Sequence, residues 1–81
     1  IKIDRSFVMG MNQSKDDNII VKTTINMCHD LGLEVVAEGV ETLDIQDSLK
    51  AMNCDYIQGY GLSYPLPFDK LVIWLQDTLK P

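Results

Sequence analysis

The sequence predicts an α/β fold with a parallel sheet. Three short apolar runs alternate with helical patterns along the 81 residues, and each run ends in polar or ionisable side chains. Strands and helices that alternate at this spacing indicate right-handed crossovers between parallel strands. A buried parallel strand whose last residues are polar is typical of a strand that opens into an active site.

Ile1–Asp4 is expected to be the end of the first strand. An irregular stretch is expected to follow through Gln13. Ser14 is a typical N-cap, and Asp16–Asp17 place negative charge near the positive end of the helix that follows. Gly32 is expected to end that helix, because glycine readily adopts the left-handed conformation there. Residues at helical spacing form one apolar stripe: Ile20, Val21, Thr24, Ile25, Met27, Cys28 and Leu31.

A second strand is expected over Leu33–Ala37, which is short, apolar and rich in β-branched residues. Thr42 can cap the next helix, and Asp44 adds negative charge to its first turn. Asn53 is expected to end that helix. Its buried face is expected to consist of Ile45, Leu49 and Met52.

Cys54–Ile57 is expected to lead into the third strand. Two glycines flank Tyr60 in the loop that follows, where the backbone can bend sharply. Pro65 and Pro67 are expected to exclude regular structure until a final helix over about Phe68–Leu79. The predicted order is therefore strand, helix, strand, helix, strand, helix.

The composition is that of a globular domain, with 46% hydrophobic and 23% charged residues. A net charge of −5 argues against binding a DNA or RNA polymer, which needs clustered Lys and Arg. No apolar run is long enough for a membrane span, and no signal peptide is recognisable. The two cysteines, Cys28 and Cys54, form neither a C-x-x-C pair nor a disulfide framework, so a reduced, cytoplasmic setting is expected. His29 is expected at the surface of a helix.

Polar side chains at the first strand end allow two interpretations. Lys2 and Asp4 are two residues apart, so their side chains should share one face of the strand. They could form a structural ion pair that caps the strand. Alternatively, Lys2 could face a phosphate or orient an attacking water, with Asp4 holding it in place.

The other two strand ends also carry polar groups with a functional and a structural interpretation. Glu38 and Glu41 flank Gly39, and two carboxylates within one turn can bind metal or act as a base. Glutamates in turns are, however, commonly just solvated. Gln58 ends the third strand, where its amide could equally well satisfy nearby backbone groups.

Four strings carry a resemblance to a known family: K-I-D-R-S-F-V (2–8), V-V-A-E-G-V-E-T (35–42), I-Q-G-Y (57–60) and P-L-P (65–67). In this order and spacing they closely resemble the C-terminal third of the EAL-domain family, the bacterial cyclic di-GMP phosphodiesterases. The resemblance implies a partial TIM-like (β/α) barrel of three consecutive βα units. A complete barrel needs roughly 250 residues, so residues 1–81 are expected to be the C-terminal fragment of a single EAL barrel domain, with its N-terminal part absent.

The resemblance also implies functions for individual residues. It makes Lys2 a required residue near the hydrolytic water, Glu38 a metal ligand or an activator of water, and Gln58 a group beside substrate and metal-bound water. These three are the expected catalytic residues, and Glu38 is the expected metal ligand. Supporting positions are implied for Asp4 and Glu41. Substrate contacts are implied for Tyr60 and Pro65, although a tyrosine at this place could also be ordinary rim packing.

The implied reaction is hydrolysis of cyclic di-GMP to pGpG with two divalent ions, Mg or Mn. The E-A-L signature and the remaining metal ligands are expected upstream of Ile1, so the fragment alone should be inactive. Sensor or GGDEF domains and a membrane anchor in the upstream part are further features that the resemblance allows. Three βα units alone leave an unpaired edge at Ile1–Asp4, so the fragment is expected either to be part of a larger protein or to self-associate, for example as a homodimer. One alternative is a degenerate EAL domain that binds cyclic di-GMP, or a partner protein, without hydrolysis. Another is a fragment of an unrelated α/β barrel.

Overall fold

The structure is a computed structural model that describes residues 1–59 and 65–67. Its elements, in chain order, are β1 (Lys2–Ile3), α1 (Arg5–Gly10), α2 (Lys15–Asp30), β2 (Val36–Val40), α3 (Leu43–Ala51), β3 (Tyr56–Gly59) and β4 (Leu66–Pro67). The predicted final helix over Phe68–Leu79 lies outside the described residues, as does the predicted loop residue Tyr60.

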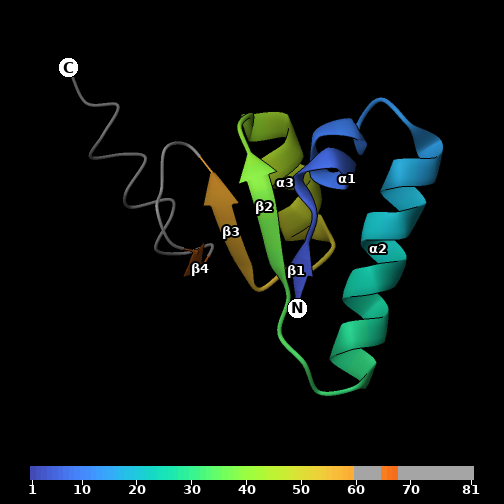
Figure 1. The fold of residues 1–81 in the computed structure, drawn as a ribbon, viewed down its shortest axis with the longest axis vertical. Coiled ribbons are helices and arrows are strands. Elements are labelled where there is room, and N and C mark those ends of the chain that lie inside the picture. Colours follow the sequence, from blue (N-terminus) through green and yellow to red (C-terminus); the bar gives the residue numbers. More distant parts are fainter. Residues whose placement is uncertain (60–64, 68–81) are drawn as a thin grey trace.

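The strands form one sheet in the order β1-β2-β3-β4 (Figure 1). β1, β2 and β3 are parallel, as the alternation of strands and helices predicted. β4 was not predicted: Leu66 pairs with Ile57 and Pro67 with Tyr56, antiparallel to β3. The expectation that the prolines exclude regular structure is wrong here. A proline is tolerated in a strand at the edge of a sheet, where its missing N–H leaves no ladder bond unmade.

A second difference is α1, which occupies a stretch that was expected to be irregular. Asp4 is its N-cap: the carboxylate accepts a hydrogen bond from the backbone N–H of Ser6 at 3.0 Å. Phe7 packs against the core, and Val8 is completely buried. Burial of a valine side chain contributes about 1.5–3 kcal/mol. The N-cap and this apolar pair together account for a helix of only six residues.

α2 begins and ends where the sequence predicted. The Ser14 hydroxyl accepts from the N–H of Asp17 at 3.3 Å. At the other end Gly32 has φ +75°, and the N–H of Leu33 donates to the carbonyl of Cys28 at 2.8 Å, which is the Schellman arrangement. Only part of the predicted apolar stripe is buried, namely Val21, Ile25 and Cys28, whereas Ile20, Met27 and Leu31 are exposed.

β2 starts three residues later than predicted and continues past the predicted end to Val40. Asp55 explains the late start, because its carboxylate accepts the N–H of Val35 at 2.8 Å and keeps that group out of the ladder. α3 follows, with Thr42 at its N-cap position but without a side-chain cap bond. Asn53, at φ 62°, follows its end as predicted.

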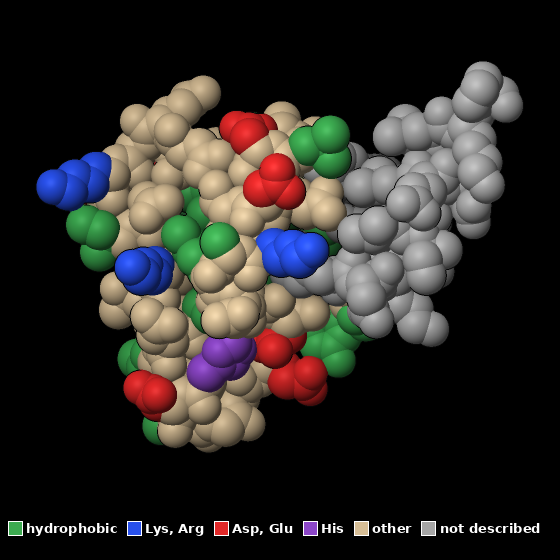
Figure 2. Space-filling model, turned by 180° about the vertical axis from the view of Figure 1, so that it is seen from behind, with side chains coloured by type: hydrophobic (Ala, Val, Ile, Leu, Met, Phe, Trp, Pro, Cys, Tyr) green, Lys and Arg blue, Asp and Glu red, His purple; other side chains and the backbone are tan. Residues whose placement is uncertain are grey.

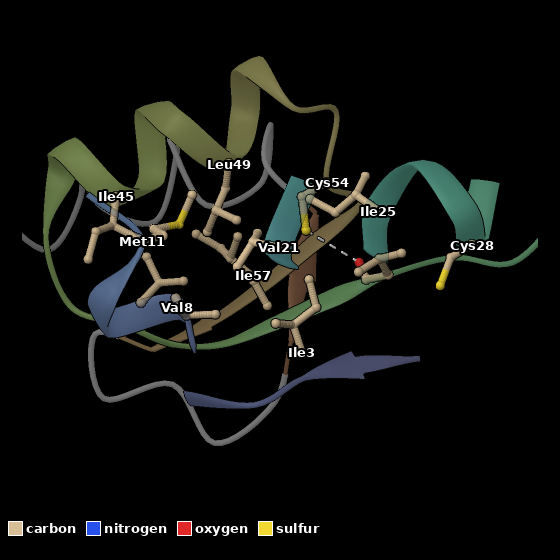
Figure 3. Close-up of a cluster of buried hydrophobic side chains, with 13 residues drawn as sticks. Ile3, Val8, Met11, Val21, Ile25, Cys28, Ile45, Leu49, Cys54 and Ile57 are labelled. Carbon is tan, nitrogen blue, oxygen red and sulfur yellow. Dashed lines mark hydrogen bonds between the residues drawn. The ribbon is translucent and has the colours of Figure 1, made fainter. Parts of the chain in front are cut away.

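The core lies between the sheet and the helices (Figure 3). Ile3, Ala37 and Ile57 are aligned across β1, β2 and β3 and are no more than 4% exposed. Helix α3 lies behind the sheet in Figure 1. Seen from behind, acidic and basic side chains are interspersed over the surface (Figure 2). None of the described helices has the length and apolar character that crossing a bilayer requires.

Candidate functional site

The polar strand ends share one face of the sheet. In parallel strands, register partners project to the same side and residues two apart do so as well. Lys2 is the partner of Val36, and Glu38 is the partner of Gln58. Lys2, Glu38 and Gln58 therefore project from the face opposite to the one that forms the core with the helices.

Lys2 and Glu38 form an ion pair across β1 and β2. The distance from Lys2 Nζ to Glu38 Oε1 is 3.5 Å, and the side chains are 61% and 34% exposed. An ion pair this accessible contributes little to stability, typically about 0–1 kcal/mol. Its main consequence is chemical, since a cation and a carboxylate stand side by side at the end of a sheet, where both remain open to a ligand.

Gln58 presents an unpaired polar atom beside this ion pair. Its Oε1 is buried and has no hydrogen-bond partner among residues 1–59 and 65–67. Leaving a buried acceptor unsatisfied costs about 1–3 kcal/mol. Such an acceptor is suited to a donor or a cation that arrives with a ligand.

Gly39 allows β2 to present carboxylates on both sides of a turn. Its φ is +76°, and the pairing of β2 with β3 shifts register between Glu38 and Val40. A Cβ at this position would lie 2.6 Å from Cγ of Arg5. The turn therefore needs glycine for its backbone conformation and also for the space that the arginine side chain fills.

Glu41 forms a second ion pair with Arg5, with 3.8 Å between its Oε1 and Nη2 of Arg5. It also lines a cavity of about 240 Å³ between the α1–α2 connection and the start of α3. In the wall of this cavity the Asn12 amide donates to Asp44 at 3.2 Å. Hydrogen bonding from Thr42, and then from Asn12, lowers the pKa of Asp44.

Asp4 does not support Lys2 in the way that either sequence interpretation expected. Its carboxylate caps α1 and accepts hydrogen bonds from both the hydroxyl and the backbone N–H of Ser6. These two bonds, the hydroxyl bond first, lower the pKa of Asp4. Within the described part of the chain, the ion pair of Lys2 is with Glu38.

The two expected substrate contacts differ in what the structure says of them. Tyr60 lies outside the described residues. Pro65 is half-buried and directly precedes β4. Because Leu66 pairs with Ile57, the same antiparallel register continued by one residue brings Pro65 level with Gln58.

Glu38 and Gln58 offer oxygen atoms, the donors that Mg²⁺, Mn²⁺ and Ca²⁺ take in proteins. The buried, unpaired Oε1 of Gln58 fits a contact to a cation or to its water shell. Over the residues that the structure describes, no group of three or more His, Cys, Asp or Glu side chains is placed to hold a metal ion. These residues therefore fit part of a divalent metal site.

Two features of the structure were missed from the sequence. Arg5, which lies against Gly39 and pairs with Glu41, was not singled out, although its position three residues after Lys2 repeats the spacing of Glu38 and Glu41. His29 lies at the surface as expected, but its contact with Asp55 was not predicted. Its side chain is 33% exposed, and its Nε2 lies 2.7 Å from Asp55 Oδ2.

Comparison with known proteins finds a matching family model and similar curated proteins. Residues 1–65 match the family model of the EAL domain. The chain is 42% identical over 76 residues, 94% of its length, to the cyclic di-GMP phosphodiesterase NbdA of Pseudomonas aeruginosa, of which it covers 10%. The bifunctional diguanylate cyclase/cyclic di-GMP phosphodiesterase MucR of the same organism is 38% identical over 72 residues, 89% of this chain and 10% of MucR.

Solved structures agree with these sequence relatives. The PaMucR phosphodiesterase in complex with c-di-GMP matches 86% of this chain and 28% of its own, with a TM-score of 0.71 and 38% identity. Klebsiella pneumoniae BlrP1 in a calcium/cyclic di-GMP complex matches 84% of this chain and 17% of its own, with a TM-score of 0.71 and 37% identity. The chain spans about a tenth of the length of the curated relatives described above.

Proposed function

Because the chain belongs to the EAL domain family, we propose that it forms the C-terminal part of a phosphodiesterase domain that hydrolyses cyclic di-GMP to pGpG. The observation that carries the proposal is the grouping of Lys2, Glu38 and Gln58 on one face of the sheet. A cation, a carboxylate and an unpaired amide oxygen at adjacent strand ends are the groups that a phosphodiester, its attacking water and a divalent ion require.

Each residue has a distinct part in this proposal. Lys2 places positive charge beside the phosphate and orients the attacking water. Glu38, 3.5 Å from Lys2, binds a divalent ion or accepts a proton from that water. Gln58 accepts a hydrogen bond through its Oε1 and can donate one through its amide nitrogen.

The remaining site residues shape the surroundings. Glu41 holds the turn after Glu38 through Arg5, and Tyr60 and Pro65 are the proposed substrate contacts. Asp4 contributes indirectly, by capping α1.

Mg or Mn is the proposed metal. Two divalent ions, when bound, would supply an activated water and stabilise the charge that develops in the reaction. Of the residues here, Glu38 would contact an ion directly and Gln58 would contact its water shell. Further ligands would come from the rest of the EAL domain, so the 81-residue chain alone should not hydrolyse cyclic di-GMP.

The test is hydrolysis of cyclic di-GMP by a complete EAL domain that contains this chain, with Mg, with Mn and with EDTA, followed by separation of the nucleotides. Formation of pGpG only with metal supports the proposal. Tight binding of cyclic di-GMP without any product would instead identify the alternative, a receptor that does not hydrolyse its ligand. Neither binding nor hydrolysis would refute both.

A further inference from the structure

We propose that Arg5 is a positioning residue that fixes the turn from Glu38 to Thr42 through its contacts with Gly39 and Glu41. The inference rests on the proposed function, because its consequence is the placement of Glu38 beside Lys2. It assigns a part in the reaction to a residue outside the proposed catalytic set of Lys2, Glu38 and Gln58.

The backbone around Arg5 is held by hydrogen bonds at the start of α1 and by a buried neighbouring residue. Arg5 is the first residue of α1, and Asp4 caps this helix through the N–H of Ser6. The carbonyl of Asp4 also accepts from the N–H of Val8 at 3.3 Å, and Val8 itself is completely buried. The arginine side chain therefore begins from a helix that is anchored in the core next to β1.

The stem of Arg5 lies directly on the turn. A Cβ built on Gly39 would be 2.6 Å from Cγ, 3.1 Å from Cβ and 3.2 Å from Nε of Arg5. The arginine thus covers the glycine backbone along most of its length. This contact is at the residue where β2 shifts register, between Glu38 and Val40.

Two ion pairs join residues 2–5 to residues 38–41. Lys2 pairs with Glu38 at 3.5 Å and Arg5 with Glu41 at 3.8 Å. Lys2 and Arg5 are three residues apart, as are Glu38 and Glu41, so each carboxylate has its own cation. Without Arg5, the Glu41 carboxylate would be left without its cation on the turn that carries Glu38, and it would compete for Lys2.

Stability alone does not account for this arrangement. The Arg5 and Glu41 side chains are 64% and 53% exposed, and such pairs add little to the free energy of folding. What the pair can set is the direction of the turn, and misplacement of a catalytic group by about 1 Å can reduce the rate about 100-fold.

The experiment is a double-mutant cycle in a complete EAL domain that contains this chain, measuring kcat and KM for cyclic di-GMP with saturating Mn. The variants are Arg5→Ala, Glu41→Ala and the two combined. Arg5→Ala is expected to lower kcat about tenfold or more with little change in KM. The combined variant should resemble Glu41→Ala rather than show the product of both losses. Arg5→Lys should restore part of the rate, because it keeps the charge but not the planar fork.

The matched control is Lys22→Ala, which removes the same charge from an exposed lysine on α2. Wild-type kcat in Arg5→Ala, or effects of Arg5→Ala and Glu41→Ala that simply multiply, would overturn the inference. It would also be overturned if Arg5→Ala lowered the melting temperature while kcat below that temperature stayed normal.

A second readout does not depend on turnover. Hydrogen exchange of the amides of residues 39–42 should be about tenfold faster in Arg5→Ala and unchanged in Lys22→Ala, since local opening sets the exchange rate. If the wild-type domain neither binds nor hydrolyses cyclic di-GMP, the proposed function fails. In that case equal exchange in wild type and Arg5→Ala would reject the positioning of the turn as well, and faster exchange would retain it.

Discussion

Glu38 on β2 and Gln58 on β3 are register partners in parallel strands. Their side chains project to the same side of the sheet, but they differ in their bonding partners. Glu38 has an ion-pair partner in Lys2, whereas the buried Oε1 of Gln58 has none among the described residues. The charge of Glu38 is thus neutralised by Lys2, whereas the amide oxygen of Gln58 is left unsatisfied. This is expected of a site whose remaining hydrogen-bond partners arrive with a ligand.

Replacing Gln58 should separate stability from activity. In a complete EAL domain, Gln58→Leu removes a buried acceptor that has no partner among residues 1–59 and 65–67, so the ligand-free domain should be unchanged or up to about 1 kcal/mol more stable. Hydrolysis of cyclic di-GMP should nevertheless fall. The measurements are urea unfolding without ligand and steady-state kinetics with metal.

Gln46→Leu provides the contrast for that experiment. Gln46 is 6% exposed and is engaged in an interaction, so its replacement should cost about 1 kcal/mol or more. A large loss of stability in Gln58→Leu, equal to that in Gln46→Leu, would show that Gln58 is an ordinary structural amide.

Removing either member of the Lys2–Glu38 pair should reduce turnover and leave the fold intact. Lys2→Ala and Glu38→Gln should each lower kcat by about 100-fold or more, consistent with loss of a group that acts on a proton or a charge in the reaction. The melting temperature should change little, because both side chains are partly exposed and the pair adds little stability. Near-normal turnover in Glu38→Gln, compared with the exposed-site control Lys15→Ala, would refute the assignment of Glu38.

Two glycines test the contact between Arg5 and the turn. Gly39 and Gly32 have nearly the same positive φ, 76° and 75°, but a Cβ would meet Arg5 only at Gly39 and nothing within 4 Å at Gly32. Gly32→Ala should therefore cost only the backbone strain, about 1 kcal/mol, and Gly39→Ala should cost more. Combining Gly39→Ala with Arg5→Ala should recover part of the difference, since the nearest atom, Cγ, is gone. Equal unfolding free energies for the two single variants would contradict this contact.

The contact between Asp55 and His29 should make stability depend on pH. Burial alone would raise the pKa of Asp55, but hydrogen bonds from His29 and from the Val35 N–H, with the charge of the nearby imidazole, outweigh it and lower the pKa. A lowered pKa in the folded state adds stability above the ordinary aspartate value of about 4, and that stability is lost as the pH falls through the lowered pKa.

Asp55→Asn should therefore cost on the order of 1 kcal/mol at pH 7, and less as the pH falls below about 4. Chemical unfolding of a complete EAL domain across this range measures the difference. Asp47→Asn, at an exposed carboxylate, should show no such change. A difference for Asp55→Asn that stays constant with pH would mean that the charge of Asp55 does not contribute.

The 81-residue chain on its own is expected to associate with copies of itself. Two apolar side chains of α2, those of Ile20 and Met27, and the side chain of its C-cap residue Leu31 are at least 41% exposed. Their spacing of seven and four residues places them on one side of the helix. Light scattering should show a mass that rises with concentration, and the combined substitution Met27→Glu with Leu31→Lys should lower it. A stable monomer at high concentration would refute this expectation.

Much of this protein was determined by its sequence alone. The sequence predicted β1, α2, β2, α3 and β3 in this order, the parallel strands, the Ser14 cap and the ends of α2 and α3 at Gly32 and Asn53, because hydrophobic spacing and capping act within a few residues. It did not predict α1 or β4. The EAL strings identified the family for the same reason, since they are contiguous in the chain.

Tertiary structure decided what depends on residues that are distant in sequence. The start of β2 is set by Asp55, which is 20 residues from Val35. Lys2 pairs with Glu38 on the neighbouring strand, a contact between residues distant in sequence, while Asp4 is left to its local partner Ser6 as the cap of α1. Arg5 lies against Gly39, 34 positions further along the chain. No pattern within a few residues of either position predicted this contact. Such contacts form only when separate strands and helices pack together, and capping or turn signals within a few residues do not specify which side chains then meet.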